Sequence, residues 1–414
     1  MQTHLAPEFQ GTPEGREAEA ILRKCVHCGF CTATCPTYQL LGDELDGPRG
    51  RIYLIKQVLE GEVPTRETQL HLDRCLTCRN CETTCPSGVQ YGHLVDIGRK
   101  VVEAKVPRPP AERRLRGVLR MGLSSPLFGP AMRLGQSARN FLPASLRAKV
   151  PPRQDAGKWP RRTHERKVLM LEGCVQPSMA PNINRATARV LDAAGIQVIR
   201  PRGQGCCGAV RFHLNDQEGA LSQMRHNIDA WWPHIESGKV EAIVMNASGC
   251  GASVKDYAHA LKDDERYARK AERVSALTRD LSEMLPDIAK ALAGKLKPVS
   301  GTVAFHPPCT LQHWQQLRGG VEQHMRALGF DVRLASAESH LCCGSAGTYS
   351  VLQPELAASL RERKLGHLLG ERAADRPAAI VSANIGCITH LQSGTDVPVR
   401  HWVEVLDEAM ISAR

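Results

Sequence analysis

Hydrophobic side chains in the first hundred residues recur at helical spacing rather than in alternation. The interval from Ile52 to Leu59 shows this most clearly, because apolar residues fall at positions 52, 55, 58 and 59 and Gly61 follows. The same reasoning, with helix-forming composition, predicts helices over residues 16–24, 50–60 and 92–105. We therefore expect a mostly α-helical domain over residues 1–105, which begins with a loose tail over residues 1–15.

The pattern changes near residue 167, where short apolar runs begin to alternate with amphipathic segments. The first run begins at residue 168, and later runs predict strands over residues 196–199, 242–246, 302–306, 332–335 and 379–384. Between them, helices are predicted over residues 186–194, 217–231, 321–328 and 355–369. Strand and helix alternate through the same order twice. This predicts a tandem pair of Rossmann-like α/β domains with parallel strands, over residues 167–297 and 298–414.

A segment rich in proline and arginine, residues 106–166, separates the two regions and is interpreted as a linker with short helices. The net charge of the chain is +11, and the stretch from Lys105 to Lys167 alone holds 16 Lys and Arg residues against three acidic ones. Such a run is either a solvated surface or a contact for anionic lipid or an acidic partner subunit. It lacks a nucleic-acid recognition motif and interleaved aromatic residues, which argues against nucleic acid.

Neither a signal peptide nor a membrane span is expected. Residues 1–15 are polar, and no run of about 18 apolar residues occurs. The protein is therefore expected to be soluble or peripheral on a membrane. The chain has 414 residues, enough for two to four domains.

Composition changes the picture through cysteine, because all 16 cysteines fall in patterned clusters. The first eight form two copies of C-x2-C-x2-C-x3-C-P, the spacing with which two-cluster ferredoxins hold 4Fe–4S clusters. In that arrangement the fourth Cys of each copy ligates the other cluster. The predicted quartets are Cys25, Cys28, Cys31 and Cys85 for one cluster, and Cys75, Cys78, Cys81 and Cys35 for the second.

Two other interpretations fit the cysteines less well. Zinc sites usually pair two C-x2-C units across a longer gap, and would leave the third Cys and the Pro of each copy without a purpose. A disulfide framework is typical of short secreted chains, whereas this chain is long. Arg49 and Arg51 lie between the motifs; they would screen cluster charge or bind a partner, but a solvated helix start is the expectation for both.

The other eight cysteines also form two matched sets. The lone Cys and the CysCys pair are separated by 31 and 32 residues in the two copies, and the pair and the last Cys by 42 and 43. The candidate metal ligands are Cys174, Cys206, Cys207 and Cys250 in the first copy, and Cys309, Cys342, Cys343 and Cys387 in the second. Four Cys are enough for a 4Fe–4S cluster or a zinc ion, so that choice stays open.

The alternative for these sets is that adjacent cysteines are small buried apolar residues. The residues lie just after predicted strand ends, where open α/β sheets bind ligands. His390 follows the last Cys by three residues and is a weaker candidate ligand. His213, His306 and His340 also lie near these cysteines, although a single His is more often a hydrogen-bonded structural residue.

One motif match is rejected. The stretch Gly203-Gln-Gly205-Cys-Cys-Gly208 has the letters of a dinucleotide-binding loop. A true fingerprint follows the first strand of its unit and opens a helix, whereas this one follows the second predicted strand. Cys207 also has a counterpart in a repeat that lacks the first two glycines, so nucleotide binding is not expected here.

The duplicated ferredoxin motif followed by paired C-x31-CCG-type repeats resembles the iron–sulfur subunit of bacterial glycolate oxidase. Related families are the L-lactate utilisation iron–sulfur protein, the iron–sulfur subunit of the anaerobic glycerol-3-phosphate dehydrogenase and the heterodisulfide reductase subunits. The stretch Gly47-Pro-Arg-Gly-Arg-Ile52 and the total length favour the glycolate oxidase group. The last Cys of each repeat departs from the C-x-x-C pair of heterodisulfide reductases, because Cys250 and Cys387 are single; this puts heterodisulfide chemistry in doubt.

The resemblance implies an electron-carrying subunit of an oxidoreductase complex, with no catalytic residue of its own. A flavoprotein partner with FAD would oxidise glycolate to glyoxylate, and this chain would pass the electrons toward quinone or another acceptor. It implies two 4Fe–4S clusters, no small-molecule substrate on this chain, and a cytoplasmic location on the inner face of the inner membrane. A lactate or glycerol-3-phosphate dehydrogenase subunit, or a disulfide or quinone reductase acting at the CCG cysteines, remains the alternative.

Overall fold

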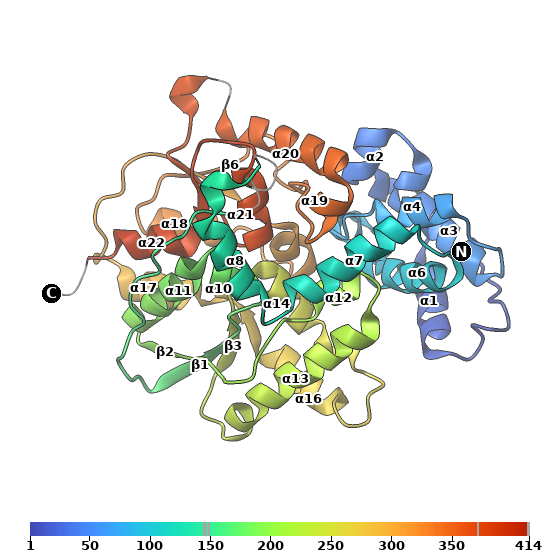
Figure 1. Cartoon of the computed structure of the whole chain (residues 1–414), viewed down its shortest axis with the longest axis horizontal. Coiled ribbons are helices and arrows are strands. Elements are labelled where there is room, and N and C mark those ends of the chain that lie inside the picture. The colour runs from blue at the N-terminus through green and yellow to red at the C-terminus, as the bar shows by residue number, and fades with distance from the viewer. Residues whose placement is uncertain (144–146, 148–149, 371, 412–414) are drawn as a thin grey trace. The chain divides into compact units, whose positions relative to one another are not determined.

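The computed structural model describes the chain except for residues 144–146, 148–149, 371 and 412–414 (Figure 1). It separates into two compact units, Met1–Gly117 with His340–Arg361, and Val118–Ser339 with Glu362–Arg414. The first unit therefore includes more than the predicted domain of residues 1–105. It gains the start of the basic segment and the chain around the second CysCys pair, which sequence periodicity assigned to the second α/β domain.

Helices make up the regular structure of the first unit, in agreement with the spacing of its apolar residues. They are α1 (Pro13–Lys24), α2 (Pro36–Leu41), α3 (Pro48–Leu59), α4 (Arg66–Asp73), α5 (Asn80–Thr84), α6 (Tyr91–Lys105) and the short α19 (Tyr349–Leu352), with 3-10 turns η1 (Phe30–Thr32) and η2 (Glu44–Asp46). Proline at the first position opens α1, α2 and α3, where its missing N–H costs nothing. The three predicted helices correspond to α1, α3 and α6.

The core of this unit lies where α1, α3 and α6 meet. Leu22, Ile55 and Leu94 are at most 1% exposed and belong to one apolar cluster. A Cβ on Gly98 of α6 would lie 2.6 Å from Cγ1 of Ile55, so only glycine permits the observed approach of α6 to α3. The cluster also includes cysteines of both ferredoxin-type motifs, so the same core supports both loops.

The N-terminal stretch is packed rather than loose, and the expectation for residues 1–15 was wrong. The Ala6 N–H donates to the Leu59 carbonyl at 2.8 Å, and Thr3 is 5% exposed. Thr12 caps α1 by accepting a hydrogen bond from the Gly15 N–H at 3.0 Å. The stretch has little periodicity because its backbone hydrogen bonds and caps, rather than an apolar face, hold it in place.

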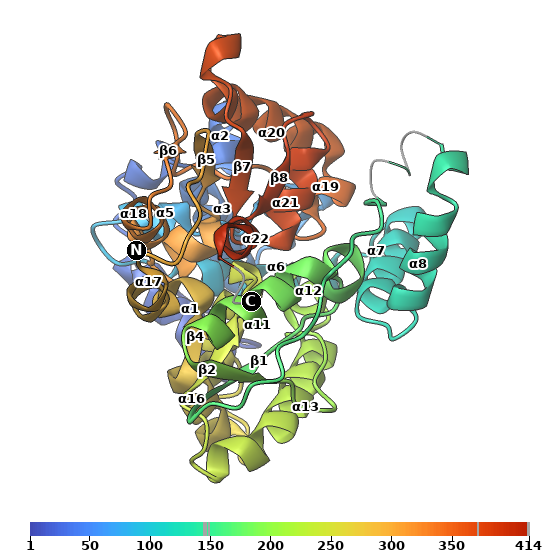
Figure 2. The same ribbon diagram turned by 90° about the vertical axis from the view of Figure 1, so that its left-hand side faces the viewer.

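The second unit contains two four-stranded sheets, and every strand pair in them is parallel. The first has the order β2-β1-β3-β4 and the second β6-β5-β7-β8. The strands are β1 (Arg166–Met170), β2 (Ile196–Ile199), β3 (Ala242–Met245), β4 (Thr278–Asp280), β5 (Val303–His306), β6 (Val332–Leu334), β7 (Ala379–Ser382) and β8 (Val399–His401). Figure 2 shows β5, β7 and β8 side by side.

Helices connect these strands. In the first repeat they are α10 (Gln176–Met179), α11 (Pro181–Ala193), α12 (Ala209–His213), α13 (Gln217–Glu236), α14 (Ser248–Lys255), α15 (Tyr257–Ala260), α16 (Ala268–Leu277), η4 (Leu281–Met284) and α17 (Leu285–Leu292). In the second they are η5 (Thr310–Trp314), α18 (Gly320–Ala327), α20 (Pro354–Leu369), η6 (Ala373–Asp375), α21 (Ile385–Gln392) and α22 (Trp402–Ala409). The predicted mixed α/β class with parallel strands is confirmed.

The edge strands β4 and β8 were missed by the sequence interpretation. Each has only three residues, Thr-Arg-Asp and Val-Arg-His, so neither forms an apolar run. Their middle residues, Arg279 and Arg400, are less buried than the residues on either side. Pairing with β3 and β7, not local apolar pattern, makes these segments strands.

The two repeats of this unit pack on each other near their strand ends. The Ser248 N–H donates to the Ala383 carbonyl at 2.9 Å, and the hydroxyls of Ser248 and Thr310 lie 2.7 Å apart. Arg189 of α11 forms an ion pair with Asp407 of α22 at 2.6 Å. The last-cysteine loop of the first repeat is therefore held against the second repeat by hydrogen bonds.

The basic segment contains short helices, as predicted: α7 (Pro110–Leu123), α8 (Phe128–Ser137) and the turn η3 (Arg139–Phe141). Two of its arginines, Arg108 and Arg116, are buried rather than solvated, however. The side chain of Arg108 is 3% exposed and lies 2.6 Å from Asp73 Oδ2, and Arg116 lies 3.1 Å from the same oxygen. Burial would raise the pKa of Asp73, but the hydrogen bond from Arg108 and the nearby positive charges outweigh it and lower that pKa.

Among the described residues, no helix combines the length and the apolar character that a membrane span needs.

Candidate metal centres

The two ferredoxin-type motifs adopt the same backbone turn. In the first motif His27 and Gly29 have φ of 57° and 87°, and in the second Thr77 and Arg79 have φ of 51° and 56°. Left-handed residues on both sides of the second Cys curl each loop so that its sulfurs converge. Repeating this uncommon conformation in both copies indicates that both loops are shaped for the same purpose.

The first loop faces a pocket, partly open to solvent, whose lining includes Cys25, Cys28, Cys31 and Cys85. Burial raises the pKa of Cys31 to about 11, and the neighbouring Cys25, Cys85 and Cys28 add to the rise. The pKa of Cys25 is raised by burial, with Cys85 and Cys28 again contributing. These four sulfurs are thus electrostatic neighbours although Cys85 belongs to the other motif.

The second quartet likewise combines three cysteines of the second motif with one, Cys35, of the first. Burial raises the pKa of Cys81 well above its usual value, and the neighbouring Cys78, Cys75 and Cys35 raise it further. Cys35 is 7% exposed; burial raises its pKa, and Cys78 contributes in the same direction. Thiols that raise one another's pKa in a buried site ionise together only if a cation compensates them, which is the property of a metal-binding set.

Arg51 lies beside this second quartet, and the expectation of a solvated helix start was wrong for it. Its side chain is 1% exposed and contacts Asp46 Oδ1 at 3.3 Å. Burial alone would lower the pKa of Arg51, but Tyr91, Cys75, Cys35 and Asp46 outweigh burial and raise it. A buried guanidinium among acidic groups compensates negative charge at this quartet. Arg49, by contrast, is 35% exposed and pairs with Glu44 at 2.7 Å.

Arg99 and Tyr91 of α6 hold the second loop in place, a role that the sequence analysis did not identify. One terminal nitrogen of Arg99 donates to the Leu72 carbonyl at 2.8 Å and to the Cys75 carbonyl at 2.6 Å, and the other donates to Thr77. The Tyr91 hydroxyl donates to Cys75 Sγ at 3.6 Å. Both residues lie on a helix predicted from periodicity alone, which says nothing about which polar residue reaches a loop.

In the first CCG repeat, all four predicted cysteines come together. Hydrogen bonds with Cys174 and Cys207 lower the pKa of Cys206. Hydrogen bonds with Cys206 and Cys250, together with burial, raise the pKa of Cys207. Cys174 follows β1 and Cys250 lies in the first turn of α14, which follows β3. Because β1 and β3 are parallel neighbours, their carboxyl ends bring these two residues to one edge of the sheet.

Main-chain contacts fix the CysCys pair of this repeat. The Tyr257 hydroxyl donates to the Cys207 carbonyl and Asn227 Nδ2 donates to the Cys206 carbonyl, both at 2.8 Å. Gly208 has φ of 93°, and a Cβ there would lie 3.1 Å from the Ala220 carbonyl oxygen. The glycine of the CCG motif is therefore a requirement of the turn after the two thiols.

The second repeat has the same turn in a different setting. Gly344 has φ of 88°, and a Cβ there would lie 2.5 Å from the Ala357 carbonyl oxygen. The loop from His340 to Arg361 belongs to the first unit, where the His340 carbonyl accepts a hydrogen bond from Asn80 at 3.3 Å. Burial raises the pKa of the Tyr349 hydroxyl in this loop, and both Cys75 and Cys342 add to the rise. Within this unit, the second ferredoxin-type motif thus has a CCG cysteine nearby.

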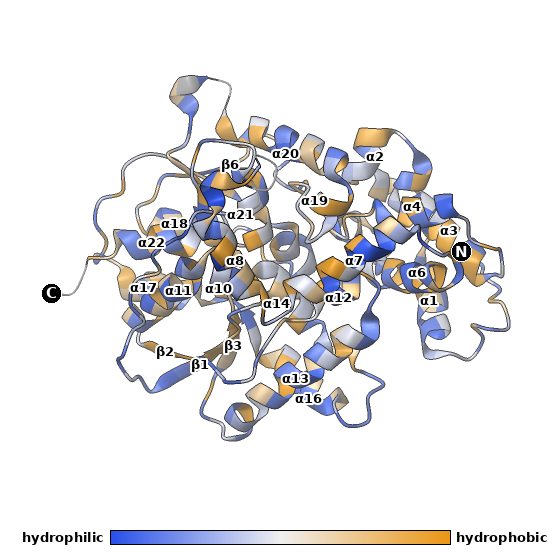
Figure 3. Ribbon diagram, viewed as in Figure 1, coloured by the Kyte–Doolittle hydropathy of each residue, from blue (hydrophilic) through white to orange (hydrophobic). Residues whose placement is uncertain are grey.

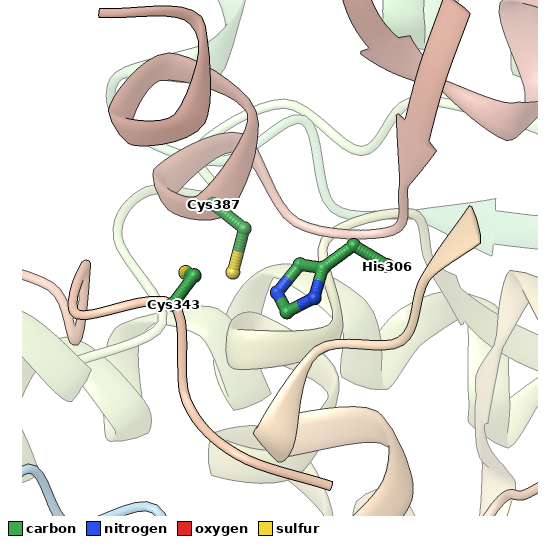
Figure 4. A group of neighbouring side chains, drawn as sticks. All are labelled: His306, Cys343 and Cys387. Carbon is green, nitrogen blue, oxygen red and sulfur yellow. The ribbon is translucent and has the colours of Figure 1, made fainter. Parts of the chain in front are cut away.

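The other cysteines of this repeat, Cys309 and Cys387, belong to the second unit and are buried. At the end of β5, a ring nitrogen of His306 lies within 4.8 Å of the Cys387 sulfur. Figure 4 shows the imidazole of His306 near the Cys387 side chain. Burial lowers the pKa of His306 well below its usual value, which keeps the ring neutral.

The other histidines considered from the sequence have these positions. His390 is on α21, three residues after Cys387, and its carbonyl accepts a hydrogen bond from Ser393. His213 is on α12 and meets Trp314 edge-on, with ring centroids 5.9 Å apart. His340 contributes its carbonyl to Asn80. No disulfide links any of the 16 cysteines, all of which lie in described residues.

In comparisons with known proteins, the ferredoxin-type motifs and the CCG repeats match two separate families. A family described as 4Fe-4S dicluster domain matches residues 21–89, and a family described as Cysteine-rich domain matches residues 168–255 and 303–392. The chain is 55% identical to the glycolate oxidase iron-sulfur subunit of Escherichia coli (strain K12), over 99% of both chains. The dicluster match and the chemistry of the two quartets indicate that the chain carries 4Fe–4S clusters.

More distant relatives match as well. The chain is 28% identical to the probable glycolate oxidase iron-sulfur subunit of Bacillus subtilis (strain 168), over 94% of this chain and 92% of the relative. It is 27% identical to lactate utilization protein A of Bacillus cereus (strain G9842), over 58% of this chain and 98% of that protein.

Proposed function

Because the chain belongs to the family of glycolate oxidase iron–sulfur subunits, we propose that it carries electrons in the oxidation of glycolate to glyoxylate. In this proposal a flavoprotein partner with FAD oxidises glycolate, and the present chain accepts the electrons and delivers them toward quinone. The observation that carries the proposal is the 55% identity over 99% of both chains, since it covers the ferredoxin-type motifs and both CCG repeats together.

The proposed ligands are the two crossed quartets, Cys25, Cys28, Cys31 and Cys85, and Cys75, Cys78, Cys81 and Cys35. The mutual effect of each quartet on its thiol pKa values supports this assignment. When bound, the two clusters supply one-electron acceptance and donation, which suits a partner flavin that releases two electrons one at a time. The chain's own residues shape the loops, bury the thiolates and, through Arg51, balance their charge.

The CCG repeats are proposed to hold one further thiolate-bound centre each, an iron–sulfur cluster or zinc. The first has Cys174, Cys206, Cys207 and Cys250, and the second Cys309, Cys342, Cys343 and Cys387. The hydrogen-bonded thiols of the first repeat support this. We further propose that each repeat is a Rossmann-like half, which its parallel strand order supports.

The proposed route places the CCG centres after the ferredoxin-type clusters. Tyr349, whose hydroxyl is under the influence of both Cys75 and Cys342, supports the proximity of the two kinds of cysteine, and the order of the centres is tested as follows. We expect Cys206→Ala and Cys342→Ala, made separately in the intact complex, to retain most glycolate-driven reduction of an artificial dye. Quinone reduction should fall at least tenfold in both variants. Loss of dye reduction to the same extent as quinone reduction would place the CCG centres before the dye and contradict this order.

The substrate is tested by co-purification of the complex followed by assays with glycolate, L-lactate and glycerol 3-phosphate. Glycolate is expected to support at least tenfold faster dye reduction than the other two. Faster turnover of lactate would favour the alternative that the similarity to lactate utilization protein A suggests. Disulfide reduction by this chain alone would replace the carrier function with a catalytic one.

Peripheral contact with an anionic membrane surface is proposed for the basic segment. Helices α7 and α8 expose large apolar side chains, with Val118, Met121, Leu127 and Leu134 between 64% and 73% exposed. Figure 3 shows hydrophobic and hydrophilic turns following each other along α7. Arginines and exposed apolar side chains on one segment match the interface of anionic lipid, where both find favourable surroundings.

Vesicle binding tests the membrane contact. The complex should bind vesicles containing phosphatidylglycerol, and raising the salt from about 0.05 M to 0.5 M should weaken binding at least tenfold, since exposed charges are then screened. Neutral vesicles should bind weakly at both salt concentrations. The double variant Met121→Ser/Leu127→Ser should reduce binding further, and equal binding by neutral and anionic vesicles would contradict the proposal.

A further inference from the structure

His306 is a buried histidine whose ring has no hydrogen-bond partner within the described part of the chain. It is the last residue of β5, and its side chain is 1% exposed. Neither Nδ1 nor Nε2 forms a hydrogen bond among the described residues. Two unsatisfied ring nitrogens in a dry site are costly, so such a group calls for a ligand. His401, another buried histidine, differs because its Nδ1 accepts from the Val403 N–H at 3.1 Å.

The backbone places this ring beside a predicted metal ligand. In the parallel pairing of β5 with β7, His306 is opposite Ser382, whose hydroxyl donates to the His306 carbonyl at 2.9 Å. The chain after Ser382 enters the first turn of α21, which carries Cys387. The resulting separation between a ring nitrogen and Cys387 Sγ is at most 4.8 Å, a distance that one shared metal ion or a cluster edge spans (Figure 4).

At the position that matches His306, the first repeat has leucine in place of histidine. Val168 pairs with Ala242 in the first sheet as Val303 pairs with Ala379 in the second, which aligns the two repeats residue by residue. His306 stands three residues before Cys309, and the residue three before Cys174 is Leu171. Leu171 is 3% exposed and packs in the apolar cluster of its sheet. The repeats match in their four cysteines, but at this buried position the first repeat has leucine and the second has histidine.

We propose that His306 is a metal ligand of the second CCG repeat, which binds its metal with nitrogen and sulfur, whereas the first repeat uses sulfur alone. Cys387, which lies in the same unit, is the neighbouring sulfur ligand. The metal is a zinc ion or an iron–sulfur cluster, both of which accept imidazole beside thiolate. The inference rests on the part of the proposed function that gives this repeat a metal, and it is independent of the substrate.

A nitrogen ligand has a chemical consequence that separates the two repeats. A neutral imidazole brings no negative charge, so a site with His306 is less negative than one built from thiolates only. For an iron–sulfur centre, replacing thiolate by imidazole raises the reduction potential. The second repeat would then hold electrons more tightly than an all-cysteine site of the same type.

The test uses the full chain, purified without oxygen and labelled with ¹⁵N in histidine only. For an iron centre, pulsed EPR should detect a directly bound ¹⁵N nucleus; for zinc, X-ray absorption at the zinc edge should require a nitrogen neighbour. His306→Leu, which copies Leu171 of the first repeat, should abolish that nitrogen signal and remove most of the metal of one centre. The iron of the two ferredoxin-type clusters should remain.

Two further variants make the result decisive. His306→Cys restores a ligand, so metal content should return toward the wild-type value while the nitrogen signal stays absent. His390→Leu should leave both unchanged, because the proposal assigns the nitrogen ligand to His306. A nitrogen signal that survives His306→Leu and His306→Cys overturns the proposal, as does its absence from the wild-type chain. A chain that lacks the signal but serves glycolate oxidation refutes this inference alone; failure with glycolate in a chain that shows it refutes only the proposed substrate.

Discussion

Replacing Cys35 with alanine is expected to remove the cluster of the second motif, although Cys35 belongs to the first. Its sulfur raises the pKa of Cys81 together with Cys78 and Cys75, so it is a neighbour of that quartet. Each cubane contains four irons, so the ferredoxin-type part should fall from about eight irons to about four. Iron and sulfide analysis of anaerobically purified protein measures the loss.

The matched variants identify which cluster is lost. The low-temperature EPR spectrum of reduced Cys35→Ala should equal that of Cys78→Ala, and the spectrum of Cys85→Ala should equal that of Cys28→Ala. The two pairs should differ from each other, because each pair retains a different cluster. If Cys35→Ala instead resembles Cys28→Ala, each motif holds its own cluster and the crossed assignment is wrong.

Replacing Arg51 with methionine is expected to destabilise the first unit by about 3–5 kcal/mol, the usual cost of removing one partner from a buried ion pair. Asp46 is fully buried and would keep Arg74, 2.8 Å away, and His71, 3.1 Å away, but it would lose its buried partner. The thiolates of Cys35 and Cys75 would lose a compensating charge as well. Anaerobic urea unfolding followed by circular dichroism measures the difference in the free energy of unfolding.

Arg49→Met is the control for this experiment, because Arg49 lies two residues away in the same helix. Its side chain is 35% exposed and its ion pair with Glu44 is screened by water, so its loss should cost less than about 1 kcal/mol. Equal destabilisation by the two variants would mean that the buried pair contributes no more than a surface one. The double variant Arg51→Met/Asp46→Asn should recover part of the loss, since it removes the uncompensated carboxylate.

The helices around the ferredoxin-type motifs and most strands of the two sheets were predicted from local pattern. The segment predicted over residues 196–199 is β2, and the one predicted over residues 355–369 falls within α20. These elements bury a regular apolar face or a continuous apolar run, and both patterns can be recognised in the sequence. The strands β4 and β8 were not found, because their neighbours in the sheet rather than their own composition determine them.

For the candidate site, too, the sequence predicted one part and missed another. Motif spacing identified all 16 cysteines, because a metal loop requires thiols at set intervals along the chain. Spacing could not show that Arg51 is buried beside Cys35 and Cys75. Nor could it show that Arg108 and Arg116 of the basic segment form buried ion pairs with Asp73. The sequence does not show whether an arginine is exposed to water or buried in a core, because that depends on the residues around it in the folded chain.

The sequence by itself determined the class of cofactor, the number of repeats and the family, since these depend on covalent spacing and on the order of apolar residues. Only the tertiary structure decided which charges are buried, that the loop from His340 to Arg361 clusters with the ferredoxin-type unit, and that His306 lies beside Cys387. The physical reason is that burial and ligand geometry arise from residues brought together across long stretches of chain, and local pattern carries no record of those encounters.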